Sequence, residues 1–207
     1  MKTKRKYIDE PEADKGCIRL MINRTCGIYC PLCYTNQYDL DTVPVVTVEE
    51  LKAAHTILLT GGDPFYVQDI ITFCIRLRLD NPNIKRLYIY TSGFKMSVTD
   101  SIRTYLDQFS NLVDGINFSP KRKADYVAIK EMLTSRNIMY DFFTHTRINR
   151  IVLMPNDFMT REQQEEYIES LPIEDPFYGK MFDVEFRDWQ EEFKPNGGVW
   201  RRLPVFF

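Results

Sequence analysis

Three cysteines near the start of the chain, Cys26, Cys30 and Cys33, have the spacing C-x3-C-x2-C. Three thiolates can hold a [4Fe–4S] cluster through three of its irons, which leaves the fourth iron able to bind another molecule. An iron with an open position is a place where a reaction can occur. Residues 26–33, hereafter the cysteine loop, are therefore predicted to hold a cluster that takes part in chemistry.

Other kinds of site could use the same thiols. His55 or His145 could complete a zinc site, although zinc ligands usually come as two separated pairs and the chain has no second pair. A disulfide framework is disfavoured, because only five cysteines serve 207 residues, Cys17 and Cys74 are isolated, and no signal-peptide pattern is present. We prefer the cluster, and a zinc site or reduced structural thiols stay open.

The composition predicts one domain. A chain of 207 residues with 44% hydrophobic and 27% charged residues can bury one substantial core and is short for two. We expect a single domain over residues 1–207, with an irregular or flexible segment at residues 1–16 and a C-terminal tail at residues 190–207.

The charge balance argues against two classes of partner. A formal net charge of -2, from 27 basic and 29 acidic side chains, gives no field that favours nucleic acid or a membrane surface. No apolar run approaches the roughly 20 residues that span a bilayer. Together with reduced thiols, these features predict a soluble, cytoplasmic protein without a nucleic-acid or membrane partner.

Strand-like and helix-like segments alternate along the chain. Apolar runs bounded by turn signals predict six strands, at residues 18–22, 56–60, 86–90, 115–118, 150–154 and 182–186. Helical spacing of apolar residues predicts five helices, at residues 47–55, 66–78, 98–109, 126–133 and 160–171. Two of these helices begin with the capping-box pattern, at Thr47 with Glu50 and at Thr160 with Gln163. Cys74 falls among the core positions of the second helix.

This order of elements predicts an α/β fold with a mainly parallel sheet and right-handed crossovers. Six strands are too few to close the eight-stranded barrel, so we expect a partial (β/α)6-type barrel, with a curved six-stranded sheet and the helices outside. Ligand groups in such folds lie at the carboxyl ends of the strands. The cysteine loop follows the first strand, and three further candidate segments follow the second, third and fourth.

The second strand is followed by the run Gly61-Gly62-Asp63-Pro64, hereafter the glycine motif. It could form a tight turn, since Gly tolerates positive φ and Asp and Pro favour turns. Glycines at a strand end also let backbone carbonyls approach a ligand ammonium closely. Beside a cysteine triad, we favour a role in cofactor binding for all four residues.

Small polar residues follow the third and fourth strands. Thr91 and Ser92 could bind a ribose or a carboxylate, or they could cap the helix that follows. Ser119 and Lys121 stand at the end of the fourth strand, and Lys121 is the side chain best suited to an anionic group of a cofactor or substrate. These four residues complete the predicted cofactor-binding set.

With these motifs the chain resembles the radical S-adenosylmethionine (SAM) superfamily, whose cysteine signature has an apolar or aromatic residue before the last cysteine, here Leu32. The glycine motif is similar to the Gly-Gly-Glu motif of that superfamily, with Asp63 in place of Glu. The resemblance implies a [4Fe–4S] cluster on the three cysteines, SAM chelated at the open iron, and the glycine motif at the SAM amino group. Reductive cleavage of SAM would give a 5′-deoxyadenosyl radical that abstracts a hydrogen atom from a substrate.

Within the superfamily, the chain is most similar to the 7-carboxy-7-deazaguanine synthase family. Cys-Tyr-Thr at residues 33–35 resembles the Cys-Asp-Thr of that family and implies a Mg²⁺ ligand at Thr35. Ser-Pro-Lys at residues 119–121 and Met-Pro at residues 154–155 also resemble its motifs. The Gly-Glu-Gly that this family has before the cysteines is missing from residues 9–16, so we expect a pterin-type or related small molecule without specifying which.

Two other functions are compatible with the sequence. Cys-Pro-Leu-Cys-Tyr at residues 30–34 also resembles the activating enzyme of anaerobic ribonucleotide reductase, which installs a glycyl radical on a partner protein. A non-catalytic metal-binding or electron-transfer module would use the cysteines and leave the glycine motif unexplained. For the preferred enzyme we expect a small-molecule substrate and a reductant such as flavodoxin or ferredoxin, and the sequence leaves room for a homodimer.

Overall fold

The computed structural model describes residues 4–28, 30, 33–134, 140, 142–143, 148–156, 158–189 and 197–205. The chain divides into two compact units. Unit 1 comprises Met1–Tyr88 and Gln190–Phe207, and unit 2 comprises Ile89–Trp189. Strand β3 (Arg86–Thr91) runs across the boundary between them.

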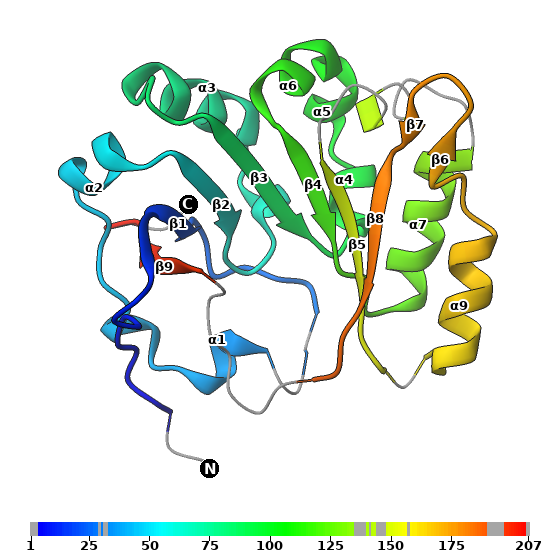
Figure 1. Cartoon of the computed structure of the whole chain (residues 1–207), viewed down its shortest axis with the longest axis horizontal. Coiled ribbons are helices and arrows are strands. Elements are labelled where there is room, and N and C mark those ends of the chain that lie inside the picture. The colour runs from blue at the N-terminus through cyan, green and yellow to red at the C-terminus, as the bar shows by residue number, and fades with distance from the viewer. Residues whose placement is uncertain are drawn as a thin grey trace. The chain divides into compact units, whose positions relative to one another are not determined.

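Unit 1 is built on three neighbouring parallel strands. Its elements are β1 (Asp14–Met21), α1 (Tyr34–Gln37), η1 (Leu40–Thr42), α2 (Val48–Ala53), β2 (Thr56–Thr60), η2 (Pro64–Tyr66), α3 (Ile70–Asp80) and β9 (Gly198–Arg202). Strand β1 pairs in parallel with β2 on one side and with β9 on the other. Figure 1 shows β9, in red, next to β1, in blue. Two segments from opposite ends of the chain therefore share one sheet.

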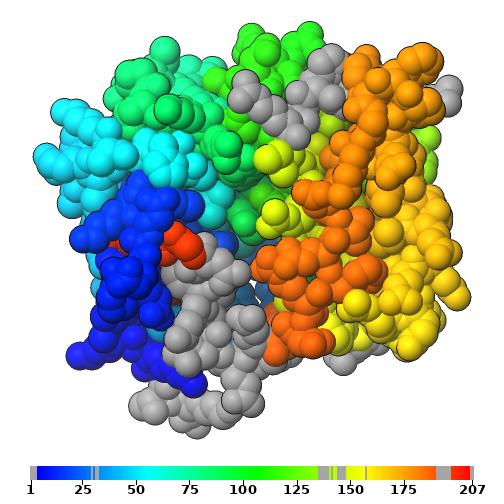
Figure 2. Space-filling view, viewed as in Figure 1, coloured from blue at the N-terminus to red at the C-terminus, as the bar shows by residue number. Residues whose placement is uncertain are grey.

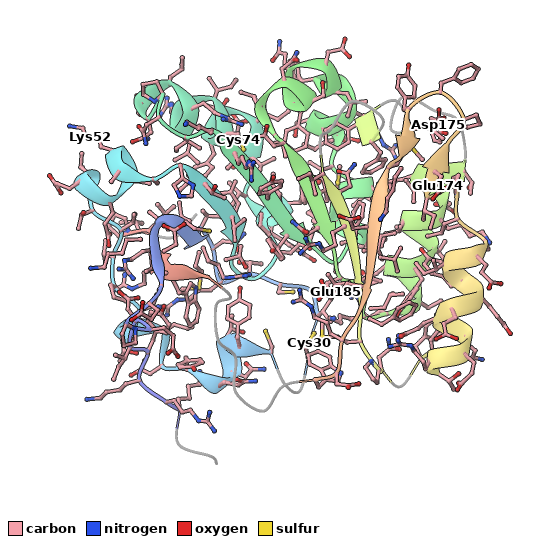
Figure 3. The ribbon with its side chains drawn as sticks, viewed as in Figure 1. Cys30, Lys52, Cys74, Glu174, Asp175 and Glu185 are labelled. Atoms are coloured by element: carbon pink, nitrogen blue, oxygen red, sulfur yellow. The ribbon has the colours of Figure 1, made fainter. Side chains whose placement is uncertain are left out.

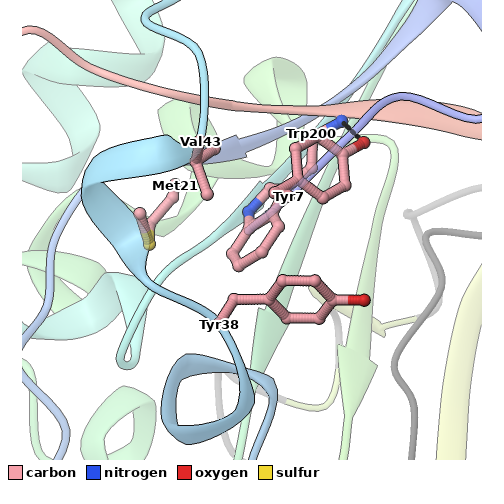
Figure 4. Close-up of a cluster of buried hydrophobic side chains, with 5 residues drawn as sticks. All are labelled: Tyr7, Met21, Tyr38, Val43 and Trp200. Atoms are coloured by element: carbon pink, nitrogen blue, oxygen red, sulfur yellow. Dashed lines mark hydrogen bonds between the residues drawn. The ribbon is translucent and has the colours of Figure 1, made fainter. Parts of the chain in front are cut away.

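A cluster of aromatic rings packs around Trp200 of β9 (Figure 4). The rings of Tyr7 and Tyr38 meet the Trp200 ring edge-on, with centroid distances of 5.2 and 5.7 Å. The Tyr7 hydroxyl also accepts a 2.9 Å hydrogen bond from the backbone N–H of Trp200. Edge-to-face packing of aromatic rings stabilises a core in addition to the stabilisation that comes from burying their apolar surface. This cluster therefore attaches the segment around Tyr7 to the sheet.

The buried guanidinium of Arg201 forms a second attachment. It donates two hydrogen bonds to the carboxylate of Asp9, of 2.8 and 2.7 Å, and one of 2.7 Å to Glu50 of α2. The Arg201 side chain is only 7% exposed, so both carboxylates are needed to compensate the cost of burying its charge. Within the segment expected to be irregular, Tyr7 and Asp9 thus have defined contacts although they precede the first strand.

Unit 2 contains a parallel sheet with helices and a small hairpin. Its elements are α4 (Phe94–Ser97), α5 (Asp100–Thr104), α6 (Leu106–Leu112), β4 (Gly115–Phe118), α7 (Lys123–Thr134), β5 (Asn149–Leu153), α9 (Arg161–Glu169), β6 (Glu174–Asp175), β7 (Gly179–Lys180) and β8 (Phe182–Phe186). Strand β5 pairs in parallel with β4 and with β8.

Aromatic packing joins the elements of unit 2. The rings of Phe118, Phe143 and Phe182 pack against one another, with centroid distances between 5.3 and 6.1 Å. At the surface, the Arg161 guanidinium at the start of α9 stacks on the Phe186 ring at the end of β8, 3.7 Å from its centroid. Figure 2 shows these neighbouring segments in yellow and orange.

The α/β class and the mainly parallel sheet are confirmed. The strand order is β8-β5-β4-β3-β2-β1-β9, so the described strands form an open sheet, as a partial barrel requires. It has seven strands where six were expected, because the stretch expected to be a C-terminal tail contributes β9. Among the described residues, no helix has both the length and the apolar character needed to cross a membrane.

The predicted helix at residues 98–109 is interrupted. Tyr105 ends α5 and precedes α6, and its φ of -119° and ψ of 35° are not helical. Apolar residues continue at helical spacing across this break, so the pattern alone could not reveal it. Both capping boxes, in contrast, are present at Thr47 and Thr160.

Candidate functional site

The cysteine loop and the glycine motif leave the sheet of unit 1 at the same edge. Strands β1 and β2 are parallel and in register up to Met21 and Thr60, so both end at the same level. One further hydrogen bond, from the Ile22 N–H to the Thr60 carbonyl (3.0 Å), continues the pairing. The chain then reaches Cys26 from one strand and the glycine motif from the other.

A hydrogen-bonded seam joins residues 23–25 to the glycine motif. The Gly62 N–H donates to both the backbone carbonyl and the side-chain Oδ1 of Asn23, at 3.1 and 3.0 Å. The Asn23 Nδ2 donates to the Asp63 carbonyl (2.9 Å), and the Asp63 N–H donates to the Thr25 carbonyl (2.8 Å). Asn23 is fully buried. The residues just before the first cysteine are therefore fixed to the glycine motif by backbone and side-chain hydrogen bonds.

The two glycines are required by this close approach. Gly61 has a φ of 149°, and a Cβ there would collide with the backbone oxygen of Asn23. A Cβ on Gly62 would overlap the carbonyl group of Thr25 and would come within 2.8 Å of the Cys26 nitrogen. The close backbone approach predicted for the glycine motif is present, and the backbone that it approaches leads into the cysteine loop.

Asp63 and Pro64 begin the short helix η2. Asp63 is 2% exposed, and its Oδ1 accepts a 3.1 Å hydrogen bond from the Phe65 N–H. Pro64 occupies the first position of the helix. This is the N-cap arrangement for which Asp and Pro are favoured. The carboxylate therefore shapes the turn, and direct contact of Asp63 with a cofactor stays a prediction.

The cysteines lie on a loop that ends in the helix α1. Cys26 is exposed and Cys30 and Cys33 are half-buried. The Cys33 N–H donates to the Cys30 carbonyl (3.0 Å), and Asn36 donates to the same carbonyl through Nδ2 (3.1 Å). The Thr35 hydroxyl lies 3.1 Å from the Cys33 sulfur. Figure 3 shows Cys30 on this loop, whereas Cys74 lies within α3, fully buried as predicted.

The cysteine loop offers three thiols as metal ligands. All five cysteines are thiols, and within the described part of the chain no three Cys, His, Asp or Glu side chains converge on a point where one metal ion could bind. A [4Fe–4S] cluster takes one thiolate per iron, so its ligands need not converge in this way. Three accessible thiols on one loop satisfy that requirement.

Of the two histidines that could complete a zinc site, His55 has other partners. The His55 ring nitrogens lie 2.9 Å from the Thr56 hydroxyl and 3.1 Å from the Asp14 carboxylate, so both are engaged. The His55 backbone N–H also donates to the Gly16 carbonyl (2.9 Å), near the start of β1 and at the opposite end of that strand from the cysteine loop, which argues against His55 as a zinc ligand. His145 lies outside the described residues, as does Leu32 of the cysteine loop.

Tyr34, which follows the third cysteine, contacts the glycine motif, a role that the sequence did not indicate. Its hydroxyl lies 2.8 Å from the Gly61 carbonyl oxygen and 2.6 Å from the Thr60 Oγ1. Its ring meets the Trp200 ring edge-on at 5.1 Å. Burial raises the pKa of Tyr34 to about 12, and the neighbouring Cys33 adds to the rise, so the phenol keeps its proton at neutral pH.

Asn23 and Tyr66 were also missed. A Cβ on Gly27 would collide with the Tyr66 hydroxyl, so the end of η2 reaches the residue after Cys26. The signal for Asn23 was weak: an amide side chain two residues beyond a strand is common in turns. For Tyr34 and Tyr66 the role depends on contacts between segments distant in sequence, which no local pattern encodes.

The other predicted residues lie in unit 2. Thr91 is buried, its Oγ1 accepts a 3.1 Å hydrogen bond from the Gly93 N–H, and its carbonyl accepts one of 2.8 Å from the Ser119 N–H. The Ser92 hydroxyl donates to Asp125 (3.1 Å). The structure therefore brings Thr91, Ser92 and Ser119 together, and the hydroxyls of Thr91 and Ser92 have local structural partners.

Asp125 organises the loop that bears Lys121. Its fully buried carboxylate accepts hydrogen bonds from the N–H groups of Lys121 (3.1 Å) and Arg122 (2.9 Å). The Lys121 ammonium donates to the Ser119 hydroxyl (2.8 Å) and lies 4.8 Å from the centroid of the Trp189 ring. A fixed ammonium between a hydroxyl and an aromatic face can bind an anionic group.

Comparison with known proteins gives a distant relationship. No family model matches the chain. Part of the chain is similar to GTP 3′,8-cyclase from Synechococcus sp. (strain CC9902), with 27% identity over 111 residues, which are 48% of this chain and 32% of that protein. The chain thus spans about a third of the length of that relative. GTP 3′,8-cyclase is a radical SAM enzyme, so the similarity supports the superfamily indicated by the cysteine spacing, and no particular member of it.

Proposed function

We propose that the chain is a radical SAM enzyme, in which Cys26, Cys30 and Cys33 hold a [4Fe–4S] cluster and SAM is cleaved reductively. The observation that carries the proposal is the hydrogen-bonded seam between residues 23–25 and the glycine motif. A zinc site needs only its ligands, and structural thiols need no second segment. A site that must hold a cluster and a small molecule together needs both segments held in place.

Each part of the site has a chemical task in this proposal. When bound, a [4Fe–4S] cluster supplies single electrons and an iron to which a small molecule can bind. The thiols of Cys30 and Cys33 are accessible enough to be loaded. Because Gly61 and Gly62 have no side chains, residues 23–25 can pack directly against them. In this proposal a backbone carbonyl of the glycine motif accepts from the ammonium group of SAM. One electron from a reductant such as flavodoxin or ferredoxin would break one sulfur–carbon bond of SAM, which gives methionine and the 5′-deoxyadenosyl radical.

For the substrate, we propose a pterin-type or related heterocycle, with chemistry like that of 7-carboxy-7-deazaguanine synthase. Two observations support this class over a partner protein. The Ser-Pro-Lys stretch that resembles this family carries a positioned ammonium, 2.8 Å from the Ser119 hydroxyl. The similar cyclase is named for GTP, whose guanine, like a pterin, is an aminopyrimidinone fused to a second ring. A role for Thr35 in Mg²⁺ binding belongs to the same proposal.

The test is anaerobic reconstitution of the full chain, followed by incubation with SAM, a reductant and one candidate substrate at a time. The substrates are the carboxytetrahydropterin precursor, GTP and the glycyl-radical subunit of an anaerobic ribonucleotide reductase, each with and without Mg²⁺. We expect the pterin to accelerate formation of 5′-deoxyadenosine and to yield the deazaguanine carboxylate. If only GTP or only the protein subunit accelerates formation of 5′-deoxyadenosine, the substrate proposal is wrong. If cluster-loaded protein never cleaves SAM, the chain is a non-catalytic module.

A further inference from the structure

Tyr34 and Asn23 flank the cysteine loop and bind the two ends of the same peptide group. The peptide between Gly61 and Gly62 consists of the Gly61 carbonyl and the Gly62 N–H. The Tyr34 hydroxyl lies 2.8 Å from that carbonyl oxygen, and the Asn23 oxygens accept from that N–H at 3.0 and 3.1 Å. One residue precedes the first cysteine and the other follows the third, so a single peptide plane is held from both sides.

Counting protons fixes the direction of the hydrogen bonds at Tyr34. A phenol has one proton, and a carbonyl oxygen can only accept. The Tyr34 O–H must therefore donate to the Gly61 carbonyl, and the Thr60 hydroxyl, at 2.6 Å, must donate to the Tyr34 oxygen. The result is a directed chain from Thr60 through Tyr34 to Gly61, in which each hydrogen bond polarises the next.

A peptide next to a glycine of φ 149° needs such a restraint. Glycine has access to much more of φ/ψ space than other residues, so the 61–62 peptide could otherwise rotate at little energetic cost. The Tyr34 ring is itself fixed by its edge-on contact with Trp200, at 5.1 Å and an interplanar angle of 82°. The Tyr34 hydroxyl therefore has a fixed position, and its hydrogen bond restrains the Gly61 carbonyl.

We propose that Tyr34 is a positioning residue that, together with Asn23, fixes the Gly61–Gly62 peptide and thereby keeps the glycine motif in the orientation required to bind the ammonium group of SAM. This inference rests on the proposed function and adds to it a role for Tyr34 that the recognised motifs do not assign. It predicts that loss of the Tyr34 hydroxyl weakens SAM binding, while the thiols, and hence cluster loading, are unaffected.

The experiment compares four variants with the wild type after anaerobic reconstitution. Tyr34→Phe removes the hydroxyl and keeps the ring, and Thr60→Val removes the donor to Tyr34. Thr60→Ser retains that donor and should rescue the loss. Tyr38→Phe removes a hydroxyl from the same aromatic cluster, where Tyr38 also meets Trp200 edge-on, and serves as the matched control. Three quantities are measured for each protein. They are the iron and sulfide content, the SAM dissociation constant, and the change that SAM causes in the electron paramagnetic resonance spectrum of the reduced cluster.

We expect Tyr34→Phe to load iron like the wild type and to bind SAM about tenfold more weakly, as loss of one partly buried hydrogen bond implies. Thr60→Val should show a smaller loss, and Thr60→Ser and Tyr38→Phe none. If the wild type binds SAM and Tyr34→Phe binds it equally well, the inference is wrong and the proposed function stands. If Tyr34→Phe fails to fold, unchanged SAM binding by Thr60→Val overturns it instead. Failure of the wild type to load iron would refute the proposed function itself.

Discussion

The amide of Asp63 donates a 2.8 Å hydrogen bond to the carbonyl of Thr25, the residue that precedes the first cysteine. This bond lies in the seam that joins residues 23–25 to the glycine motif, and its length leaves no space for side chains between the two segments. A motif that follows one strand is thus held directly against the loop that follows the neighbouring strand. The predictions for unit 1 depend on this closeness.

Replacing Gly62 should separate the two segments. In Gly62→Ala the new methyl group would overlap the Thr25 carbonyl, so the backbone must move, at a cost of about 1–3 kcal/mol for overpacking. We expect reduced iron content and loss of SAM binding. Gly179→Ala is the control for backbone strain without a steric clash, because Gly179 has a φ of 73° and nothing lies within 4 Å of the added Cβ. Equal iron contents in the two variants would contradict the steric account.

The cysteines should differ in reactivity. Burial raises the pKa of the Cys74 thiol to about 12, so both its thiolate fraction and its access to reagents are low at pH 8. We expect iodoacetamide to modify Cys26, Cys30 and Cys33 in the cluster-free protein and to leave Cys74 intact until the chain unfolds. Cluster loading should protect the three loop cysteines. Peptide mass spectrometry measures each site, and rapid labelling of Cys74 in the native protein would contradict the burial assigned to it.

The ion pair of Asp9 with Arg201 should stabilise unit 1 in a pH-dependent way. The hydrogen bonds from Arg201 lower the pKa of Asp9. Its contribution is therefore fully present above the usual carboxyl pKa and is lost as the pH falls through the lowered value. Because Asp9 is 32% exposed, we expect Asp9→Asn to reduce the free energy of unfolding at pH 7 by about 1–3 kcal/mol, less than for a fully buried pair.

Urea denaturation of the wild type and Asp9→Asn, at neutral pH and at successively lower pH, measures this contribution. The two unfolding free energies should converge in acid. A difference that stays constant with pH, or that grows as the pH falls, would show that the effect does not come from the ionised Asp9.

Removal of the Lys121 ammonium should weaken binding without unfolding unit 2. The backbone at Lys121 is fixed by Asp125, so Lys121→Met should keep the loop in place while the charge is lost. If this ammonium binds an anionic group of SAM or of the substrate, the KM for that molecule should rise about tenfold, which is about 1.4 kcal/mol. Lys130→Met is the control, since Lys130 is an exposed lysine of α7 in the same unit. Similar KM values in both variants would exclude the assigned role.

Features encoded by short-range patterns were predictable from the sequence. The bounds of β2, β4 and β8 and the two capping boxes follow from apolar runs and from residues three apart. The hairpin of β6 and β7 was not predicted, because each of its strands has only two residues. Features that depend on distant partners were missed. Strand β9 is established by its pairing with β1 and by the contacts of Trp200 with Tyr7 and of Arg201 with Asp9, across most of the chain.

In the candidate site, too, features encoded by short-range patterns were predictable and features that depend on distant partners were not. The cysteine loop and the glycine motif stand out by spacing and composition, and their common edge followed from the predicted parallel sheet. The hydrogen bonds of Asn23 and Tyr34 to the 61–62 peptide could not be predicted. Asn23 is about forty residues from that peptide in sequence and Tyr34 about thirty, so no local pattern connects them. Asp63, predicted as a cofactor contact, has its carboxylate in a turn. Sequence patterns identify the segments of such a site, and the packing decides which atoms remain accessible.

The central claim is that the cysteine loop supports reductive cleavage of SAM. The most direct measurement is the amount of 5′-deoxyadenosine formed from SAM by anaerobically reconstituted protein, with and without reductant. The wild type and Cys17→Ala should form it only with reductant, and the variant with Cys26, Cys30 and Cys33 all changed to Ala should form none. Equal amounts of product from the wild type and the triple variant would contradict the account.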